Sequence, residues 1–348
     1  MVVCNVKMVV MVKSFCEFRK NTDFCRLAKI LVFAVAVFLV ALPSSAKTTK
    51  GVWWWSGDDV AKPTLVAQRL KFLVAHGVDE IYFWANLAKY GKETRSFVKA
   101  AGRKGMRVAL LSGDVSWIRP DNRGFSEIKE AYLSYQKAAA PNERFYALHL
   151  DVEPHQDRKL SDARKWQLYA DFVLRASADI HAAGEKIEWD IPFWLDNIRV
   201  DFGERTDVSL LEVVMGCSDC VALMSYRDTA KAMLDISKTE LSLAEKGGIR
   251  VVLGAETGET GEGSFVTFFE EGARYMDSEL SKVVSALESV NVPSGAGIAI
   301  HHLGSWEKLV EKENKKRKNS FFSRHAAFWP DSSVLKLLTP PDSTSCLR

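Results

Sequence analysis

The feature that most constrains the fold is a regular alternation of short apolar runs with longer stretches of helical periodicity. Most of the runs are followed by a segment in which apolar residues recur every three or four positions. Strands that alternate with helices favour a parallel sheet with helical crossovers. The strand candidates are residues 51–56, 80–86, 107–112, 145–155, 186–194, 220–226, 250–256 and 297–302.

Eight strand–helix units over roughly 265 residues predict an α/β fold of the (β/α)8 TIM-barrel type, which typically takes ~250 residues. A doubly wound sheet is the alternative, but its glycine-rich phosphate turn is absent after residues 51–56. The helix between the fifth and sixth strands has the weakest support, since only residues 210–214 show helical periodicity there. The other predicted helices cover residues 64–76, 92–103, 125–139, 166–176, 268–284 and 306–315.

The N-terminus has the pattern of a signal peptide. Arg26 and Lys29 precede an apolar run over residues 30–42, and the small residues Ser44 and Ala46 follow it. The run is too short to cross a ~30 Å hydrocarbon core comfortably. We therefore expect a secreted or periplasmic protein, cleaved near Ala46 and without stable membrane insertion afterwards. An uncleaved N-terminal membrane anchor is the alternative.

Composition fits one large domain. The chain has 348 residues and is 47% hydrophobic, enough for a single large core. The leader holds six of the 47 Lys and Arg residues and two of the 44 Asp and Glu residues, so the rest is nearly neutral. No nucleic-acid partner is expected from that balance, and the oligomeric state is not indicated. The predicted segments are a signal peptide over 1–46, a barrel catalytic domain over 47–320 and a C-terminal extension over 321–348.

Two cysteines beyond the leader have C-x-x-C spacing. Cys217 and Cys220 lack the second pair that a zinc site would need. We expect either a local disulfide or two inert thiols beside a strand.

The fourth strand candidate ends in two carboxylates on one face. Strand alternation directs the aliphatic residues of 145–155 toward the covering helices and His149, Asp151 and Glu153 toward the barrel interior. Charged groups there need a cavity or partners. Since barrel enzymes carry their sites at the C-terminal ends of strands, this is a candidate catalytic strand.

A second interior carboxylate is expected at the end of the seventh strand candidate, across the barrel. Glu256 and Glu153 would then flank a glycosidic bond, with Glu153 as proton donor and Glu256 as nucleophile or base. A separation of ~5–5.5 Å would imply retention of configuration and ~6.5–9.5 Å inversion. Alternatively, Glu256 is a rim acid paired with Arg227 or Arg250.

Asp151 lies two residues deeper than Glu153, ~6.5 Å along the strand. Because two close carboxylates repel, one pKa should rise, and a raised pKa of Glu153 would suit a general acid. The alternative is that Asp151 is held by His149 or Tyr226 and only braces the barrel.

The remaining strand ends are rich in acids and aromatic rings, which suits a carbohydrate substrate because flat rings stack on sugar faces. We expect neither a cofactor nor a metal. Metal ligands could come from residues such as His155, but no H-E-x-x-H spacing occurs and His155 is expected to point away from its neighbours. The substrate-binding candidates are Asp151, Asp190, Tyr226, Trp306, Trp194, Trp84, Asn86, Arg227 and His302.

The fourth strand resembles the D-x-x-D-x-D-x-E motif of family 18 chitinases. Asp151 and Glu153 match its last two positions, and His149 replaces the preceding aspartate. Met224-Ser225-Tyr226 resembles the family's M-x-Y on strand six, and Trp306 lies where its strand-eight tryptophan would be. The resemblance implies substrate-assisted hydrolysis, with Glu153 as the acid and with Asp151 and Tyr226 holding an acetamido group that acts as nucleophile.

A second partial resemblance is to the clan A retaining glycosidases. Glu153-Pro154 and Glu256 match their N-E-P motif and strand-seven nucleophile, while Val152 replaces the asparagine. The chain as a whole more closely resembles an uncharacterised family of bacterial (β/α)8-barrel proteins of the glycoside hydrolase superfamily. The matching segments are DVEPH at 151–155, DIPFW at 190–194, MSYRD at 224–228, AETG at 255–258 and AIHH at 299–302.

Three functions remain open from the sequence. The first is a secreted glycoside hydrolase that uses the Glu153/Glu256 pair. The second is a substrate-assisted hydrolase that uses Asp151, Glu153 and Tyr226. The third is a non-catalytic carbohydrate-binding or cell-envelope protein on a glycosidase-like barrel.

Overall fold

The computed structural model describes residues 48–289, 293 and 295–328, with side chains as far as Lys318. All of them belong to the second of the chain's two units, Lys47–Arg348. The predicted signal peptide and most of the predicted C-terminal extension lie outside the described residues. Among the helices that are described, none is long and apolar enough to cross a bilayer.

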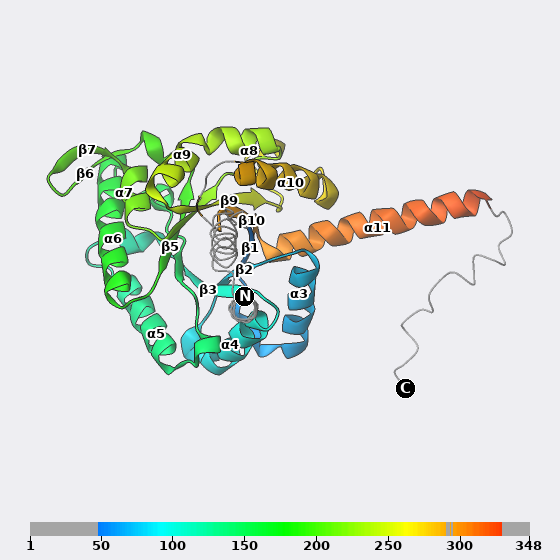
Figure 1. The fold of residues 1–348 in the computed structure, drawn as a ribbon, viewed down its shortest axis with the longest axis horizontal. Coiled ribbons are helices and arrows are strands. Elements are labelled where there is room, and N and C mark those ends of the chain that lie inside the picture. Colours follow the sequence, from blue (N-terminus) through cyan, green and yellow to red (C-terminus); the bar gives the residue numbers. More distant parts are fainter. Residues whose placement is uncertain (1–47, 290–292, 294, 329–348) are drawn as a thin grey trace, which may run out of the picture. The chain divides into compact units, whose positions relative to one another are not determined.

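Eight parallel strands close into a barrel, which confirms the predicted TIM-barrel fold (Figure 1). The order around the barrel is β1-β10-β9-β8-β5-β4-β3-β2. The strands are β1 (Thr49–Trp54), β2 (Glu80–Trp84), β3 (Arg107–Ser112), β4 (Leu148–Leu150), β5 (Ile187–Pro192), β8 (Cys220–Met224), β9 (Arg250–Glu256) and β10 (Gly297–His301).

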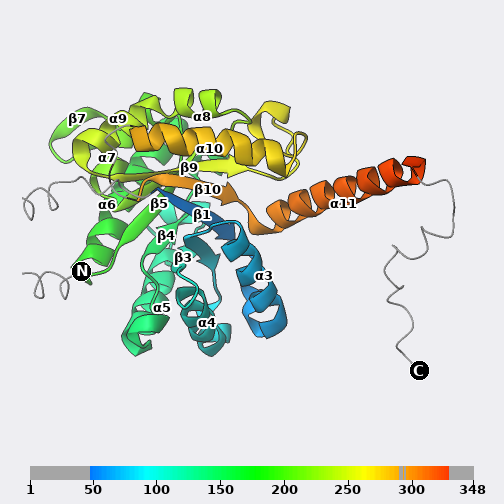
Figure 2. The same cartoon turned by 45° about the vertical axis from the view of Figure 1, so that its right-hand side comes forward.

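Helices surround the barrel and pack on its outer face (Figures 1 and 2). The last helix begins against β1 and β10, and its C-terminal part projects away from the barrel. The helices are α3 (Pro63–Ala75), α4 (Leu87–Gly102), α5 (Gly124–Ala138), α6 (Asp162–Ala182), α7 (Leu210–Gly216), α8 (Ala230–Ile236), α9 (Lys238–Gly247), α10 (Ala273–Ser289) and α11 (Leu303–Phe328).

An antiparallel hairpin that the sequence analysis missed is inserted between β5 and α7. It consists of β6 (Arg199–Phe202) and β7 (Arg205–Ser209), and Val200 pairs with Val208 across it. Both valines are buried, whereas most neighbouring hairpin residues are exposed. A hairpin with so little apolar pattern gives a weak signal in a sequence.

The inside–outside alternation of the strands follows the prediction. Leu148 and Leu150 of β4 join the core between barrel and helices, while His149 stacks on Tyr82 inside the barrel with ring centroids 4.1 Å apart. Gly254 of β9 faces the interior, and a Cβ there would lie 3.0 Å from the Tyr226 ring.

The N-terminal end of the barrel interior is filled by buried charges. Arg250 donates from Nη1 to Glu188 Oε1 at 3.0 Å and from Nη2 to Glu80. Arg107 also donates to Glu80, from Nε to Oε1 at 3.1 Å. Glu80 and Glu188 are 0% and 2% exposed, and such partners offset the cost of burying a carboxylate.

His149 extends this network toward the other end of the barrel. It donates from Nδ1 to Glu188 Oε2 at 3.0 Å and from Nε2 to Asp190 Oδ1 at 2.9 Å. An imidazole that donates from both nitrogens is an imidazolium. Burial opposes this charge, but Asp190 and Glu188 outweigh burial and raise the pKa of His149 to about 10.

Candidate functional site

The two carboxylates of the fourth strand lie just beyond the end of β4. The backbone N–H of Asp151 donates to Ser112 O of β3 at 2.9 Å, and Glu153 directly precedes a 3-10 turn, Pro154–Gln156. Gly113 permits this close approach, since a Cβ at that position would overlap the carbonyl group of Asp151. The geometry of Asp151 therefore depends on a glycine of the neighbouring strand end.

Gly113→Ala is expected to lower the free energy of unfolding by about 1–3 kcal/mol, because the added methyl forces two backbone segments apart. Gly91→Ala in α4 is the matched control: its Cβ meets nothing within 4 Å, and helix propensity favours alanine. Urea unfolding of both variants checks the prediction. Equal stability of the two variants would show that the contact is easily relieved.

Asp151 carries an unpartnered buried carboxylate oxygen. Its Oδ1 has no hydrogen-bond partner, and the sequence-based alternative in which His149 holds it is wrong, because His149 donates to Glu188 and Asp190 instead. Burial, followed by the charges of Asp190 and Glu153, raises the pKa of Asp151 to about 8. This carboxyl is therefore mostly protonated at neutral pH.

Glu153 has the opposite electrostatic state, which corrects the expectation of a raised pKa. His155 Nε2 lies 3.1 Å from Glu153 Oε2, and Gln156 Nε2 donates to Oε1 at 2.8 Å. Burial acts to raise the pKa of Glu153, but the contacts with His155 and Gln156 outweigh it and hold the pKa below its usual value. His155 thus points toward Glu153 and not away from its neighbours, as the sequence had suggested.

Glu256 is held by His301 and by its own backbone loop. Its Oε1 accepts from the N–H groups of Thr257 at 2.8 Å and Gly258 at 2.6 Å, and His301 Nδ1 donates to Oε2 at 2.6 Å. Burial acts to raise the pKa of Glu256, but these donors hold it below its usual value. The alternative pairing with an arginine is wrong for Glu256.

His301 is a site residue that was not among the candidates from the sequence. Trp55 Nε1 donates to His301 Nε2 at 3.3 Å, so Nδ1 carries the hydrogen that Glu256 accepts. The register of β9 and β10 places His301 beside Glu256. Strand alternation in AIHH predicts an inward side chain at His301, and that signal could have identified it in place of His302.

Tyr226 lies close enough to four acidic side chains for their charges to affect its pKa. Its ring lies 5.7 Å from that of His301. Burial raises the pKa of its hydroxyl, and the charges of Asp190, Glu256, Asp151 and Glu153 raise it further. The structure therefore brings the carboxylates that follow β4 and the one at the end of β9 into the field of one phenol, although β5 and β8 separate these strands.

Two predicted tryptophans remain at least partly exposed to solvent. Trp84 is 37% exposed at the end of β2. Trp194 is partly buried, with ring centroids 5.6 Å from His155 and 5.4 Å from Trp166. It supports the histidine that pairs with Glu153, and it stays a candidate for substrate contact.

Three other predicted contacts have structural roles. Trp306 is 0% exposed and packs against Phe72 and His76, so the expectation of a stacking surface is wrong. Asp190 is 2% exposed and accepts from His149 and from Trp53 Nε1 at 2.9 Å. Asn86 caps α4 by accepting from Lys89 N at 3.0 Å.

His302 is partly buried and lies at the start of α11. Its Nδ1 accepts from Gly304 N at 3.2 Å. Burial lowers the pKa of His302, so the structure keeps it mostly neutral near pH 7.

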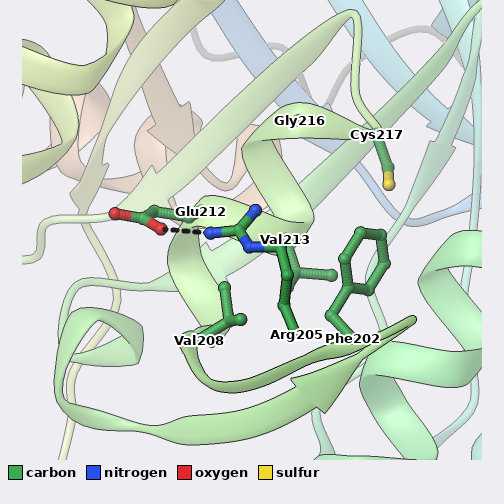
Figure 3. A pocket seen from close by; sticks show the side chains of 7 residues that line it. All are labelled: Phe202, Arg205, Val208, Glu212, Val213, Gly216 and Cys217. Atoms are coloured by element: carbon green, nitrogen blue, oxygen red, sulfur yellow. Dashed lines mark ion pairs between the residues drawn. The ribbon is translucent and has the colours of Figure 1, made fainter.

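Cys217 and Cys220 are free thiols. Cys220 lies inside the barrel, and Cys217 lines a small cavity of about 160 Å³ between the β6–β7 hairpin and α7 (Figure 3). A larger cavity of about 1010 Å³ lies at the N-terminal ends of β1 and β10. Neither cavity includes a predicted site residue. In the part of the chain that is described, no three His, Cys, Asp or Glu residues are grouped to hold a metal ion.

No protein-family model and no curated protein matches the sequence. Solved structures with a similar barrel include the C-terminal domain of a putative chitinase from Desulfitobacterium hafniense DCB-2 (12% identity, TM-score 0.43, 63% of this chain and 71% of that one). They also include a chitinase from Chromobacterium violaceum ATCC 12472 (12%, 0.44, 76% and 98%). A third is the spore cortex-lytic enzyme SleL of Bacillus megaterium QM B1551 (10%, 0.43, 77% and 74%). At such low identity and TM-score, function has to be argued from the residues of the site itself.

Proposed function

We propose that the protein hydrolyses glycosidic bonds of N-acetylated sugars, with the acetamido oxygen of the substrate as nucleophile. The observation that carries this proposal is the state of Asp151. Its carboxyl is partly buried, its Oδ1 is buried without a hydrogen-bond partner, and it is mostly protonated at neutral pH, two residues before an ionised Glu153. Two carboxyls whose environments separate their pKa values are the usual arrangement for acid–base chemistry.

In the proposed reaction the two carboxyls share one proton. Binding of the acetamido N–H at Asp151 favours its ionised form, so the proton passes to Glu153. Glu153 donates it to the leaving oxygen as the acetamido oxygen attacks C1, giving a cyclic oxazolinium ion that the Asp151 carboxylate stabilises. Water then attacks C1, the bond between C1 and the acetamido oxygen breaks to restore the acetamido group, and the Glu153 carboxylate takes a proton from the attacking water. The hydroxyl of Tyr226, which stays protonated because its pKa is raised, serves as a donor to the acetamido oxygen.

The hydrogen bonds that Glu256 accepts favour the substrate-assisted scheme over direct attack of Glu256 on C1. Both of its oxygens already accept hydrogen bonds from Thr257, Gly258 and His301, so it would have to give up a donor to attack C1. The runner-up is a two-carboxylate mechanism with Glu256 as nucleophile, which the low pKa of Glu256 favours because a nucleophile must be ionised.

The test compares aryl glycosides of N-acetylglucosamine and of glucose. The proposal predicts cleavage of the N-acetyl compound alone, since only it carries the nucleophile. Glu153→Gln and Asp151→Asn are each expected to reduce kcat by about 10²–10⁴-fold, while Glu256→Gln retains activity per folded molecule. Asp171→Asn on the exposed face of α6 is the matched control and keeps full activity.

Other outcomes separate the alternatives. Cleavage of both glycosides, with Glu256→Gln inactive, would favour the two-carboxylate mechanism. Sugar binding without hydrolysis of either compound would favour a non-catalytic carbohydrate-binding protein. Full activity of Glu153→Gln contradicts both catalytic schemes.

A further inference from the structure

Arg227 follows Tyr226 at the C-terminal end of β8 and is clamped between two aromatic rings. Its guanidinium carbon lies 5.1 Å from the ring centroid of Phe193 and 5.4 Å from that of Phe265. Nη1 donates to the carbonyl oxygen of Tyr226 at 2.7 Å. These three contacts fix the plane of the guanidinium and use one of its five N–H groups.

The loops that hold this stack also carry the candidate site. Asp228 N donates to Phe265 O at 3.0 Å, which joins the segment after β8 to the segment after β9. Gly263 has φ +115°, and a Cβ there would lie 2.7 Å from the Phe265 ring, so the turn needs glycine for two reasons. Phe265 nevertheless stays 54% exposed. The stack is thus a partly open structure at the edge where the chemistry is proposed.

Arg227 has no carboxylate partner among the described residues. Other partly buried arginines do: Arg69 pairs with Asp59, and Arg119 pairs with Asp157. A guanidinium presents a planar fork that matches a carboxylate in a bidentate manner. A fixed, partly buried guanidinium that has no anionic partner among the described residues is available to bind an anionic group of a ligand.

We propose that Arg227 binds a carboxylate of the substrate, so that the protein acts on N-acetylated glycans that carry carboxyl groups in preference to neutral ones. The acetamido part of this inference rests on the proposed function, whereas the carboxylate part rests on Arg227 alone. Glycan strands in which alternate N-acetyl sugars bear a lactyl ether with a free carboxylate have both groups. Chitin oligosaccharides have the same linkage and acetamido groups but no carboxylate.

The test uses two tetrasaccharides: alternating N-acetylglucosamine and N-acetylmuramic acid with free lactyl groups, and chitotetraose. Their Kd values are measured by calorimetry for wild type, Arg227→Met and Arg227→Lys. Wild type is expected to bind the carboxylated compound about 10–100-fold more tightly, the equivalent of one charged hydrogen-bonded pair. Arg227→Met loses the preference. Arg227→Lys keeps part of it, since lysine retains the charge but not the fork.

A control and a counter-outcome make the result decisive. Arg274→Met removes an exposed arginine of α10 whose side chain is 72% exposed, and the preference should survive it. If Arg227 only stabilises the two loops, Arg227→Met weakens binding of both tetrasaccharides by the same factor. The ratio of the two Kd values then stays at its wild-type value, which overturns the inference. Equal affinity of wild type for the two compounds, or binding of neither, overturns it as well. A wild type that prefers the carboxylated compound but cleaves neither refutes the proposed hydrolysis and leaves the inference standing.

Discussion

Replacing Arg250 by methionine is expected to lower the free energy of unfolding by about 3–5 kcal/mol. Arg250 is 8% exposed and donates to both Glu188 and Glu80. Without it, two fully buried carboxylates keep only His149 and Arg107 as cationic partners. The predicted loss is the penalty of burying negative charge without its main compensation, and not the loss of packing, because methionine keeps much of the apolar stem.

The control for this prediction is Arg274→Met, the same substitution at an exposed ion pair with Glu313. That pair should contribute less than about 1 kcal/mol. Urea unfolding at pH 7 measures both variants. Adding Glu188→Gln to Arg250→Met should recover part of the loss, because it removes one of the uncompensated charges. A loss for Arg250→Met no larger than that of the control would contradict the prediction.

The titration of Asp151 is expected to lower the free energy of unfolding by about 3–4 kcal/mol as the pH rises from 5 to 8. The pKa of Asp151 is about 8 in the folded protein, against a model value of 3.8. The native state therefore holds a proton that the unfolded chain releases, and this contribution is present at low pH and lost as the pH rises through the folded pKa. Glu153 and Glu256, whose pKa values are lowered, act in the opposite sense, but only near and below their ordinary range.

Asp151→Asn should remove the Asp151 part of the slope, since an amide does not titrate, and leave the parts due to His149 and Glu240, whose pKa values are also raised. Asp171→Asn should leave the whole slope as in wild type. Chemical unfolding at pH 5, 6, 7 and 8 gives the four points needed. His149 adds a decline in all variants between its ordinary pKa of 6.5 and its folded pKa of about 10, because the folded protein keeps a proton that the unfolded chain releases. An unchanged slope in Asp151→Asn would mean that another group carries the proton.

The strands of the barrel could be predicted from the sequence because period-two alternation fixes which side chains face inward. That rule placed His149 inside the barrel and Glu256 near Tyr226. It stops at Leu150, where β4 ends. Beyond that point a 3-10 turn places His155 in contact with Glu153. Because this contact lowers the pKa of Glu153, the raised pKa belongs to Asp151 and not, as had been expected, to Glu153.

Other errors have equally local causes. Trp306 lies on α11 and not at a strand end, so its direction is set by helix packing against Phe72 and His76. Asn86 lies directly before α4, where a polar residue is the usual N-cap, and that signal was in the sequence. The pairing of His301 with Glu256 needed the register between β9 and β10, which the sequence of one strand does not contain.

The charged network at the N-terminal ends of the strands has a consequence for how a ligand could enter and leave the barrel. Glu80, Glu188 and Arg250 occupy that end, and none of these residues is more than 8% exposed. In the proposed hydrolysis, substrate, water and product would then all pass through the C-terminal end of the barrel. In a hydrolysis that proceeds through a bound intermediate, the leaving half of the substrate has to depart before the attacking water can take its place. The salt bridges that occupy the N-terminal end of the barrel would thus set the order of the two steps without contacting the substrate.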